Sequence, residues 1–287
     1  MEVVMGRSKS LKLFLAGAEA DGLRTVEIAN MTIHATFFPR SLLKEFEQCP
    51  EAERPGVYIL LGPEINCAYI GEGDPVKPRL QSHNRSDDKS FWTETIVFTS
   101  KDNNLTKTHI QYIESALCKK VEKANNVKLK NTNKPTYPNI SISEKSDIEY
   151  FIENIELILD SFRYDLLKSR IVKIEPSILG KVVYEGKNKG ALAKMTNVEG
   201  KYVIIAGSIV VKTVQNSCSQ LIKQTRESLL KQGVIIECED EKNYKFVFNY
   251  AFSSPSGAAT IVVGGAANGR TFWKFEGKTL QEIEGND

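Results

Sequence analysis

The sequence predicts an α+β protein built from two domains that follow a strand-rich leading segment. At 287 residues, 41% of them hydrophobic, the chain is long enough to bury two cores. Strand-like runs and amphipathic helices follow one another without a regular βα alternation. Composition shifts toward charges and glycines between residues 164 and 190. We therefore expect a lead-in at residues 1–50, a first domain at residues 51–165 and a second domain at residues 180–287.

The leading segment is expected to form short strands and one short helix. β-like runs occur at residues 25–28 and 31–38. The apolar spacing over residues 41–48 is typical of a short helix. We expect this segment to pack beside the first domain.

A hairpin opens the first domain. Two apolar runs, residues 57–61 and 68–70, carry one tyrosine each, Tyr58 and Tyr69. The residues between these runs include glycine, proline and asparagine, which favour a turn. A further strand is expected at residues 91–99.

A helix is expected directly after the hairpin. Val76 and Leu80 share one of its faces, and Arg79 and His83, four residues apart, share another. Two tyrosines, an arginine and a histidine thus converge from a hairpin and the helix that follows it. Each alone has an ordinary explanation, because strand tyrosines usually pack and helix arginines and histidines usually lie at the surface. Their conjunction favours a chemical site.

The next helix, expected at residues 107–123, has a carboxylate within its apolar stripe. The stripe consists of Ile110, Ile113, Leu117 and Val121. On a 3.6-residue period Glu114 falls inside it. A carboxylate among core positions is unfavourable unless it is paired or binds a metal. Glu114 is therefore a candidate metal ligand, with a salt bridge as the structural alternative.

A lysine-rich segment follows this helix. Residues 119–134 carry six lysines against one acid, Glu122, with asparagines among them. One reading is a solvated helix end and loop. The other is a phosphate-facing edge, whose binding would weaken steeply with salt.

The first domain is expected to close with a helix. Ser146 and Glu149 match the pattern of a capping box, which indicates a helix start. The apolar residues from Ile148 to Phe162 then form a long buried face. This face would complete the core of the first domain.

The second domain is expected to contain strands and helices in succession. The elements are a hairpin of residues 202–205 and 208–211 around Gly207, a helix at 217–232 ended by Gly233, a strand pair at 234–237 and 244–248, and a helix capped by Ser254 with Pro255 at its first position. A glycine-rich aromatic segment, residues 264–275, ends the chain. We expect an α+β unit.

Composition and motifs exclude several classes of protein. The formal charge of +2 leaves no polybasic tail, so any contact with nucleic acid must be a local patch. Five cysteines without a CxxC pair argue against a disulfide framework or a structural zinc site and favour reduced, buried thiols. No run approaches the roughly 18 apolar residues of a membrane span. The protein is expected in the cytoplasm, without a membrane, and it has no GxSxG, P-loop or HExxH motif.

The ordered motif residues resemble those of the GIY-YIG nuclease superfamily. Gly56-Val57-Tyr58 and Tyr69-Ile70-Gly71 correspond to the two triplets, with valine in place of the first isoleucine. Arg79, His83 and Glu114 follow in the expected order, and the resemblance covers roughly residues 55 to 140. It implies a small antiparallel sheet flanked by helices.

The resemblance also implies a mechanism. Glu114 would hold one divalent cation, Mg²⁺ with Mn²⁺ as a substitute, against the scissile phosphate of DNA. Tyr58 would act as general base on the attacking water, and Tyr69 would position the water or phosphate. Arg79 would stabilise charge on the phosphate, and His83 would help take the proton of Tyr58. Cleavage would leave a 5′-phosphate and a 3′-hydroxyl.

An asparagine usually completes such a site beyond the metal-binding helix. Asn131 or Asn133 is our candidate, and Asn126 is the alternative. Lys128 and Lys130, beside them, are expected to contact the substrate.

The second domain carries a resemblance of its own. The segment FSSPSGAATIVVGGAANGRTFWKF looks like the SPSxAA and NGxxxW signature of an uncharacterised domain that often follows GIY-YIG modules. Such domains are similar to restriction- and methylase-associated modules thought to sense DNA or its modification. Pro39-Arg40-Ser41 in the leading segment also fits such proteins. The structural alternative is that Ser254-Pro255 starts a helix, Trp273 is core and Asn268-Gly269 is a turn.

We expect a metal-dependent endonuclease that acts on double-stranded DNA in restriction, defence or repair. Two alternatives stay open. In the first, the chain is a non-catalytic DNA-binding protein that senses DNA modification through its second domain. In the second, the second domain mediates protein association. Oligomeric state is not indicated by the sequence.

Overall fold

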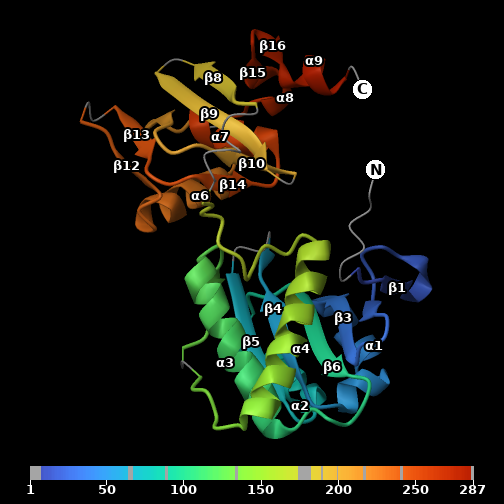
Figure 1. Ribbon diagram of the computed structural model, residues 1–287. Helices are drawn as coiled ribbons and strands as arrows, with labels where there is room; N and C mark the ends of the chain where they lie inside the picture. Colours follow the sequence, from blue (N-terminus) through green and yellow to red (C-terminus); the bar gives the residue numbers. More distant parts are fainter. Residues whose placement is uncertain are drawn as a thin grey trace. The chain divides into compact units, whose positions relative to one another are not determined.

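The computed structural model describes residues 8–63, 67–87, 90–132, 135–173, 182–188, 190–198, 200–215, 218–239 and 242–285. The chain divides into two compact units, residues 1–168 and residues 169–287, each with its own sheet (Figure 1). Helices and antiparallel strands occur in both units, so the predicted α+β class is confirmed.

One sheet organises the first unit. Within the described residues its strand order is β1-β2-β3-β6-β4-β5-β7, antiparallel throughout except for the parallel pair β5 and β7. Its strands are β1 (Leu11–Leu15), β2 (Arg24–Ile28), β3 (Ile33–Pro39), β4 (Gly56–Leu61), β5 (Cys67–Gly73), β6 (Glu94–Ser100) and β7 (Lys128–Leu129). The predicted hairpin is β4 and β5. Strands of the leading segment belong to this same sheet, because β3 pairs with β6 along its whole length.

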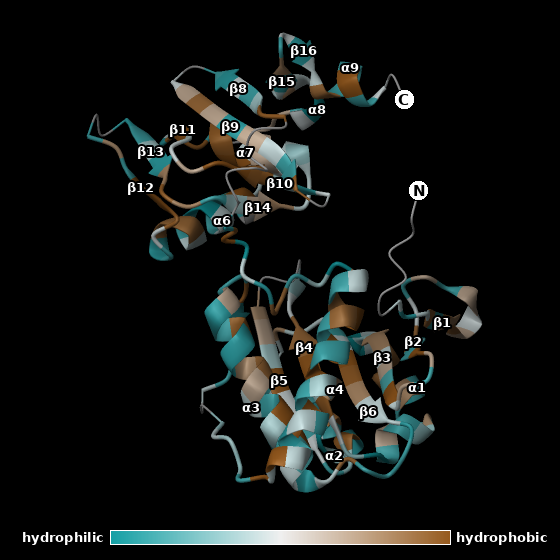
Figure 2. Cartoon of the chain, in the orientation of Figure 1, coloured by the Kyte–Doolittle hydropathy of each residue, from teal (hydrophilic) through white to brown (hydrophobic). Residues whose placement is uncertain are grey.

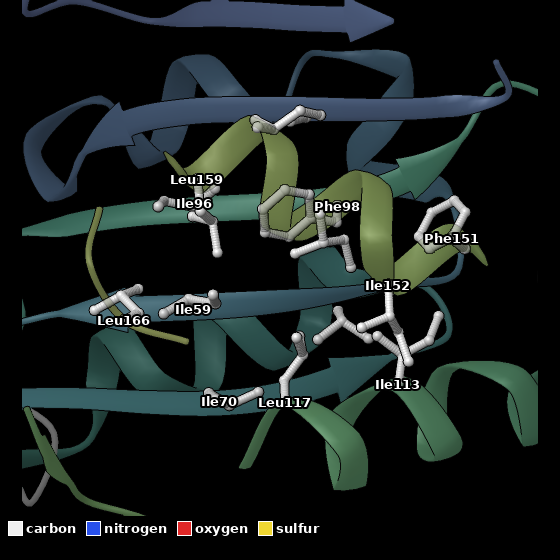
Figure 3. Packing of buried hydrophobic residues seen from close by; sticks show 14 of the residues in the cluster. Ile59, Ile70, Ile96, Phe98, Ile113, Leu117, Phe151, Ile152, Leu159 and Leu166 are labelled. Atoms are coloured by element: carbon white, nitrogen blue, oxygen red, sulfur yellow. The ribbon is translucent and has the colours of Figure 1, made fainter. Parts of the chain in front are cut away.

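Helices cover both faces of this sheet. The helices described in this unit are η1 (Ala16–Ala18), η2 (Arg40–Leu42), α1 (Leu43–Phe46), η3 (Pro50–Glu53), α2 (Val76–Arg85), α3 (Lys107–Ala124) and α4 (Ile142–Ser161). On one face, Ile59, Ile70, Ile96 and Phe98 of the strands pack with residues of α3 and α4 (Figure 3). On the other face, α1 and α2 pack over a second cluster that includes Tyr58, Leu60 and Val97. Strand β4 is largely hydrophobic and β6 is hydrophobic at its centre, whereas α3 and α4 also carry hydrophilic residues (Figure 2).

The start of α4 differs from the prediction. The helix begins at Ile142, and Ser141 is its cap. The Ser141 side chain accepts a hydrogen bond from the amide of Glu144, and the Glu144 carboxylate accepts one from the amide of Ser141. The capping box predicted at Ser146 and Glu149 is therefore wrong. Ser141 and Ser146 both precede an acid by three residues, so both match the capping pattern. The helix starts before its apolar run does, because Ile142 in the first turn is 91% exposed.

A second sheet organises the second unit. Within the described residues its order is β12-β13-β11-β9-β8-β15-β16, and β10 pairs with β9 and β14. The strands are β8 (Tyr184–Asn188), β9 (Ala191–Val198), β10 (Lys201–Ile204), β11 (Ile209–Val211), β12 (Ile235–Glu237), β13 (Asn243–Phe246), β14 (Tyr250–Phe252), β15 (Lys274–Phe275) and β16 (Lys278–Thr279). The helices are α6 (Gln220–Lys231), α7 (Pro255–Val263), α8 (Gly269–Phe272) and α9 (Leu280–Glu284).

The predictions for this unit are confirmed in part. The strand pair β12 and β13 and the cap of α7 by Ser254 are confirmed. The hairpin expected around Gly207 does not form, because β10 and β11 both pair with β9 rather than with each other. Strand β9 is long enough to accept the two short strands one after the other along its edge.

The structure also tests the expectations of buried, reduced cysteines and of no membrane-spanning segment. All five cysteines are free, but only Cys67 and Cys118 are buried. The expectation of burial is wrong for Cys49, Cys218 and Cys238, which are partly exposed. Among the described helices, none has the length and apolar character needed to cross a membrane.

Candidate active site

Tyr58 and Tyr69 lie on the same side of the hairpin. Tyr58 of β4 is the cross-strand partner of Gly71, and Tyr69 of β5 is the partner of Leu60, two residues further along β4. The two phenol rings have centroids 6.4 Å apart. His83 of α2 lies beside both rings, with centroid distances of 5.5 Å to Tyr58 and 5.1 Å to Tyr69. The structure thus brings three of the predicted site residues together.

A short hydrogen bond joins Tyr58 to His83. The Tyr58 hydroxyl oxygen lies 2.6 Å from Nε2 of His83. Tyr58 is fully buried and His83 is 7% exposed, so water competes little for this bond. When His83 carries its proton on Nδ1, the phenol donates and Nε2 accepts. The pair is then arranged to pass the phenolic proton to the imidazole.

The surroundings hold both phenols in their protonated form. Burial is the main cause that raises the pKa of Tyr58. The neighbouring Tyr69 and Glu114 raise this pKa further, whereas Arg79 opposes the rise through its charge and a hydrogen bond. Burial is also the main cause that raises the pKa of Tyr69, again with Arg79 opposing and Glu114 adding to it. A cation placed near these oxygens would lower both pKa values.

Arg79 reaches the tyrosines because glycine lets α2 come close. A Cβ on Gly73 would lie 2.8 Å from Cα of Val76 and 3.0 Å from Cγ of Arg79. The Arg79 side chain is exposed, and the neighbouring Tyr58 is the first cause that raises its pKa. An exposed, permanently charged guanidinium beside two phenols is suited to binding a phosphate group.

Glu114 comes to the same place from α3. It is half-buried, and its charge contributes to the raised pKa of both Tyr58 and Tyr69. One turn further along α3, burial and then Glu114 raise the pKa of the Cys118 thiol to about 12. The helix therefore presents one carboxylate to the tyrosines, and the thiol beside it is not ionised at neutral pH.

The asparagine candidates have structural partners. Asn131 makes two hydrogen bonds to the backbone of Ile70: its Nδ2 donates to the carbonyl at 2.7 Å, and its Oδ1 accepts from the amide at 3.0 Å. Asn126 donates to the carbonyls of Asp165 and Lys168, both at 2.8 Å. Asn133 lies outside the described residues. Asn131 therefore holds the backbone of β5 at Ile70, one residue from Tyr69.

Lys128 and Lys130 lie at the β5 edge of the sheet. Both are exposed, and β7 pairs with residues Cys67 and Ala68 of β5. The ammonium of Lys130 is 5.5 Å from the centre of the Phe91 ring. The two lysines thus form a basic border next to the strand that carries Tyr69.

Gly71 and Gly73 were not predicted as site residues. Their position opposite Tyr58 and beneath Arg79 explains them, since each is a point of close approach for a site residue. In the sequence, Gly71 is marked as the last residue of the Tyr69-Ile70-Gly71 triplet, and Gly73 follows two residues later on the same strand.

The signature of the second unit joins α7 to α8. The hydroxyl of Ser256 accepts from the amide of Gly269 at 3.0 Å, and the indole N–H of Trp273 donates to the carbonyl of Pro255 at 3.0 Å. A Cβ on Gly269 would lie 2.2 Å from the carbonyl carbon of Pro255. Trp273 is fully buried. Ser254-Pro255 starts a helix and Trp273 is core, as the structural alternative expected. The turn expected at Asn268-Gly269 is wrong, because Asn268 caps α8 and Gly269 is the first residue of that helix.

The second unit also matches a known family. Residues 183–284 match the Domain of unknown function (DUF4357). The match extends from just before β8 to the end of α9, so the expected uncharacterised C-terminal domain is confirmed. Comparison with curated proteins and with solved structures gave no match.

The buried charge of the DUF4357 segment is also structural. Arg226 of α6 is 3% exposed, and its guanidinium donates to the carbonyls of Ile261, at 2.7 Å, and Val211. Burial is the main cause that lowers its pKa. Arg226 thus ties the last turn of α7 to the end of β11, and its charge is not available to a ligand.

Proposed function

We propose that the first unit is a metal-dependent DNA endonuclease of the GIY-YIG type, which leaves a 5′-phosphate and a 3′-hydroxyl and serves restriction, defence or repair. One observation carries the proposal. The hydroxyl of buried Tyr58 lies 2.6 Å from Nε2 of His83, beside Arg79 and within reach of the charge of Glu114. Structural packing alone would not require these four polar groups to converge.

Tyr58 is the general base of the proposed reaction. It accepts a proton from the attacking water as its own proton passes to His83. A phenol with a pKa of about 10 must be stabilised as phenolate by roughly 4 kcal/mol to ionise at pH 7, and burial increases this requirement. Arg79 supplies part of the stabilisation, and its exposed donors also bind the phosphate. Tyr69 is close enough to orient the water or the phosphate oxygen.

Glu114 fits a magnesium ion rather than a metal held wholly by protein. Among the described residues there is no group of three or more histidine, cysteine or acidic side chains that could hold a metal. A single carboxylate, completed by waters and phosphate oxygens, is a usual environment for Mg²⁺, with Mn²⁺ as a substitute. Such an ion would neutralise phosphate charge and favour the ionised phenol.

The substrate of the proposed enzyme is double-stranded DNA. Lys128 and Lys130 are exposed at the β5 edge, and we propose that they contact phosphates next to the one that reacts. The DUF4357 segment supplies a second contact with DNA. Binding should then weaken as salt rises, because each phosphate contact releases counterions.

The test is nicking of a supercoiled plasmid by the full chain with Mg²⁺, Mn²⁺ or EDTA. Wild type should nick in either metal, and Glu114→Gln should lose nicking by about 100-fold or more. Glu122→Gln is the matched control, since it makes the same change two turns further along α3. Absence of nicking by wild type, or equal nicking by Glu114→Gln, would exclude the proposed activity.

The same experiment separates the other functions. Salt-sensitive DNA binding without cleavage, unchanged in Glu114→Gln and Tyr58→Phe, would favour a non-catalytic DNA-binding protein. Self-association without DNA binding would favour a role in protein assembly for the DUF4357 segment.

A further inference from the structure

Arg40 fastens the end of the helix that carries His83. It follows β3, and its guanidinium reaches the last turn of α2. Nε donates to Oδ1 of Asn84 at 2.9 Å, and Nη2 donates to the Asn84 carbonyl at 3.1 Å. Nη1 donates to the carbonyl of Ser90 at 3.2 Å. The guanidinium carbon lies 4.7 Å from the centre of the buried Trp92 ring.

These contacts leave Arg40 poorly suited to binding phosphate. All three of its nitrogens donate to groups of the protein, and one face of the guanidinium plane lies on an indole. A phosphate-binding arginine presents a free fork of two donors. Arg40 therefore differs from Arg79, and its partners indicate that it fixes α2.

The end of α2 is where such an arginine has most effect. Carbonyls in the last turn of a helix lack partners within the helix, and positive charge is favourable there. Arg40 satisfies the carbonyl of Asn84, the residue directly after His83. At the other end, the Val76 amide donates to the Arg54 carbonyl at 3.1 Å. Each end of α2 is thus tied to a different part of the sheet unit.

The hydrogen bond between Tyr58 and His83 depends on this anchoring. Tyr58 is held in the sheet and is fully buried, so a movement of the last turn of α2 changes the distance to His83 directly. A shift of about 1 Å would lengthen a 2.6 Å contact beyond the range of a good hydrogen bond. We propose that Arg40 is a positioning residue that holds His83 against Tyr58. Its effect on catalysis rests on the proposed function, whereas its effect on His83 does not.

Arg24 provides a closely matched control. Its guanidinium also makes three hydrogen bonds, to the Ala20 carbonyl at 2.6 Å and to Glu94 and the Tyr164 hydroxyl at 3.1 Å each. It too lies over a buried ring, 5.5 Å from the centre of Phe37. None of these contacts is with α2. Arg24→Ala therefore removes a similar set of contacts without releasing His83.

The experiment compares Arg40→Ala, Arg40→Lys and Arg24→Ala in the full chain. Nicking by Arg40→Ala should fall about 10-fold at neutral pH, as expected when a group that orients a site residue is lost. The pH dependence of nicking by Arg40→Ala should also change, because His83 is no longer held in place to take the proton of Tyr58. Arg40→Lys should recover part of the rate. Arg24→Ala should keep the wild-type pH profile.

A second measurement does not require activity. The ring ¹H–¹⁵N signals of His83 should shift in Arg40→Ala and stay unchanged in Arg24→Ala. Unchanged His83 signals in folded Arg40→Ala, or equal shifts in both variants, would overturn the proposal. If wild type does not nick DNA, the proposed function fails and these signals still decide the role of Arg40. If Arg40→Ala does not fold, Asn84→Ala, which removes the acceptor of Nε alone, gives the same comparison.

Discussion

Gly71 packs directly against the hydroxyl of Tyr58. The two residues are cross-strand partners on β5 and β4, and a Cβ on Gly71 would lie 2.4 Å from the phenolic oxygen and 2.5 Å from Cζ. No side chain fits there while Tyr58 keeps its hydrogen bond to His83. The last glycine of the Tyr-Ile-Gly triplet is thus required by the position of the first tyrosine.

Gly71→Ala should displace the Tyr58 ring. We expect a loss of about 1–3 kcal/mol in the free energy of unfolding, typical of overpacking a buried site. The measurement is urea-induced unfolding, with Gly22→Ala as the control because its Cβ would meet nothing closer than Cβ of Glu19 at 3.2 Å. In a Tyr58→Leu background the same change should be milder. Equal losses in both backgrounds would show that the clash is not with Tyr58.

The elements of this fold that could be predicted are those whose hydrophobic residues repeat with a helical or strand period. The hairpin of β4 and β5 and the helix α3 follow from local patterns, and Glu114 was found because it interrupts an apolar stripe. The partners of β10 and β11 were not predictable, because two strands that are adjacent in sequence can both pair with a third. Local periodicity fixes the type of an element and not its neighbour.

The contacts that support the site were harder to predict. Arg40 bonds to Asn84 across 44 positions of sequence, and Asn131 bonds to Ile70 across 61. Neither pairing leaves a pattern in a single sequence. The glycines beside Tyr58 and Arg79 have a physical reason only once the strand register is known.

Asn131→Ala should act through β5 rather than through direct contact with substrate. Its side chain satisfies both backbone groups of Ile70, so its loss should lower the free energy of unfolding by about 1–3 kcal/mol. Hydrogen exchange at the Ile70 amide should become faster. Asn126→Ala, which also removes two hydrogen bonds, should leave that amide unchanged. Weaker DNA binding with an unaltered Ile70 amide would instead support the predicted contact with substrate.

His34 should make the first unit sensitive to acid. It is 6% exposed, and its Nε2 lies 3.9 Å from carboxylate oxygens of Glu27 and Glu51. Burial lowers its pKa more than these two acids raise it. Since the unfolded chain then takes up a proton first, at about pH 6.5, this histidine reduces stability as pH falls below that value.

The corresponding measurement is the free energy of unfolding of wild type and His34→Gln at pH 7.5 and pH 5.0. The advantage of wild type over the variant should shrink, or reverse, at the lower pH. Thr36→Val, a neighbouring buried change without a titratable group, should differ from wild type by the same amount at both values. A difference for His34→Gln that is constant or grows toward pH 5.0 would contradict the sign of the pKa shift.

Two glycines of the DUF4357 signature should respond to alanine in opposite ways. Gly269→Ala would place a Cβ 2.2 Å from the Pro255 backbone, so it should separate α8 from α7 and weaken the bond from Trp273. Gly257 lies within α7, where its nearest neighbour would be the Ser254 hydroxyl at 3.1 Å, and alanine there should be neutral or stabilise by up to about 1 kcal/mol. Hydrogen exchange of peptides from α7 and α8 in the full chain measures both effects. Unchanged protection in Gly269→Ala would show that the signature is not the joint between these helices.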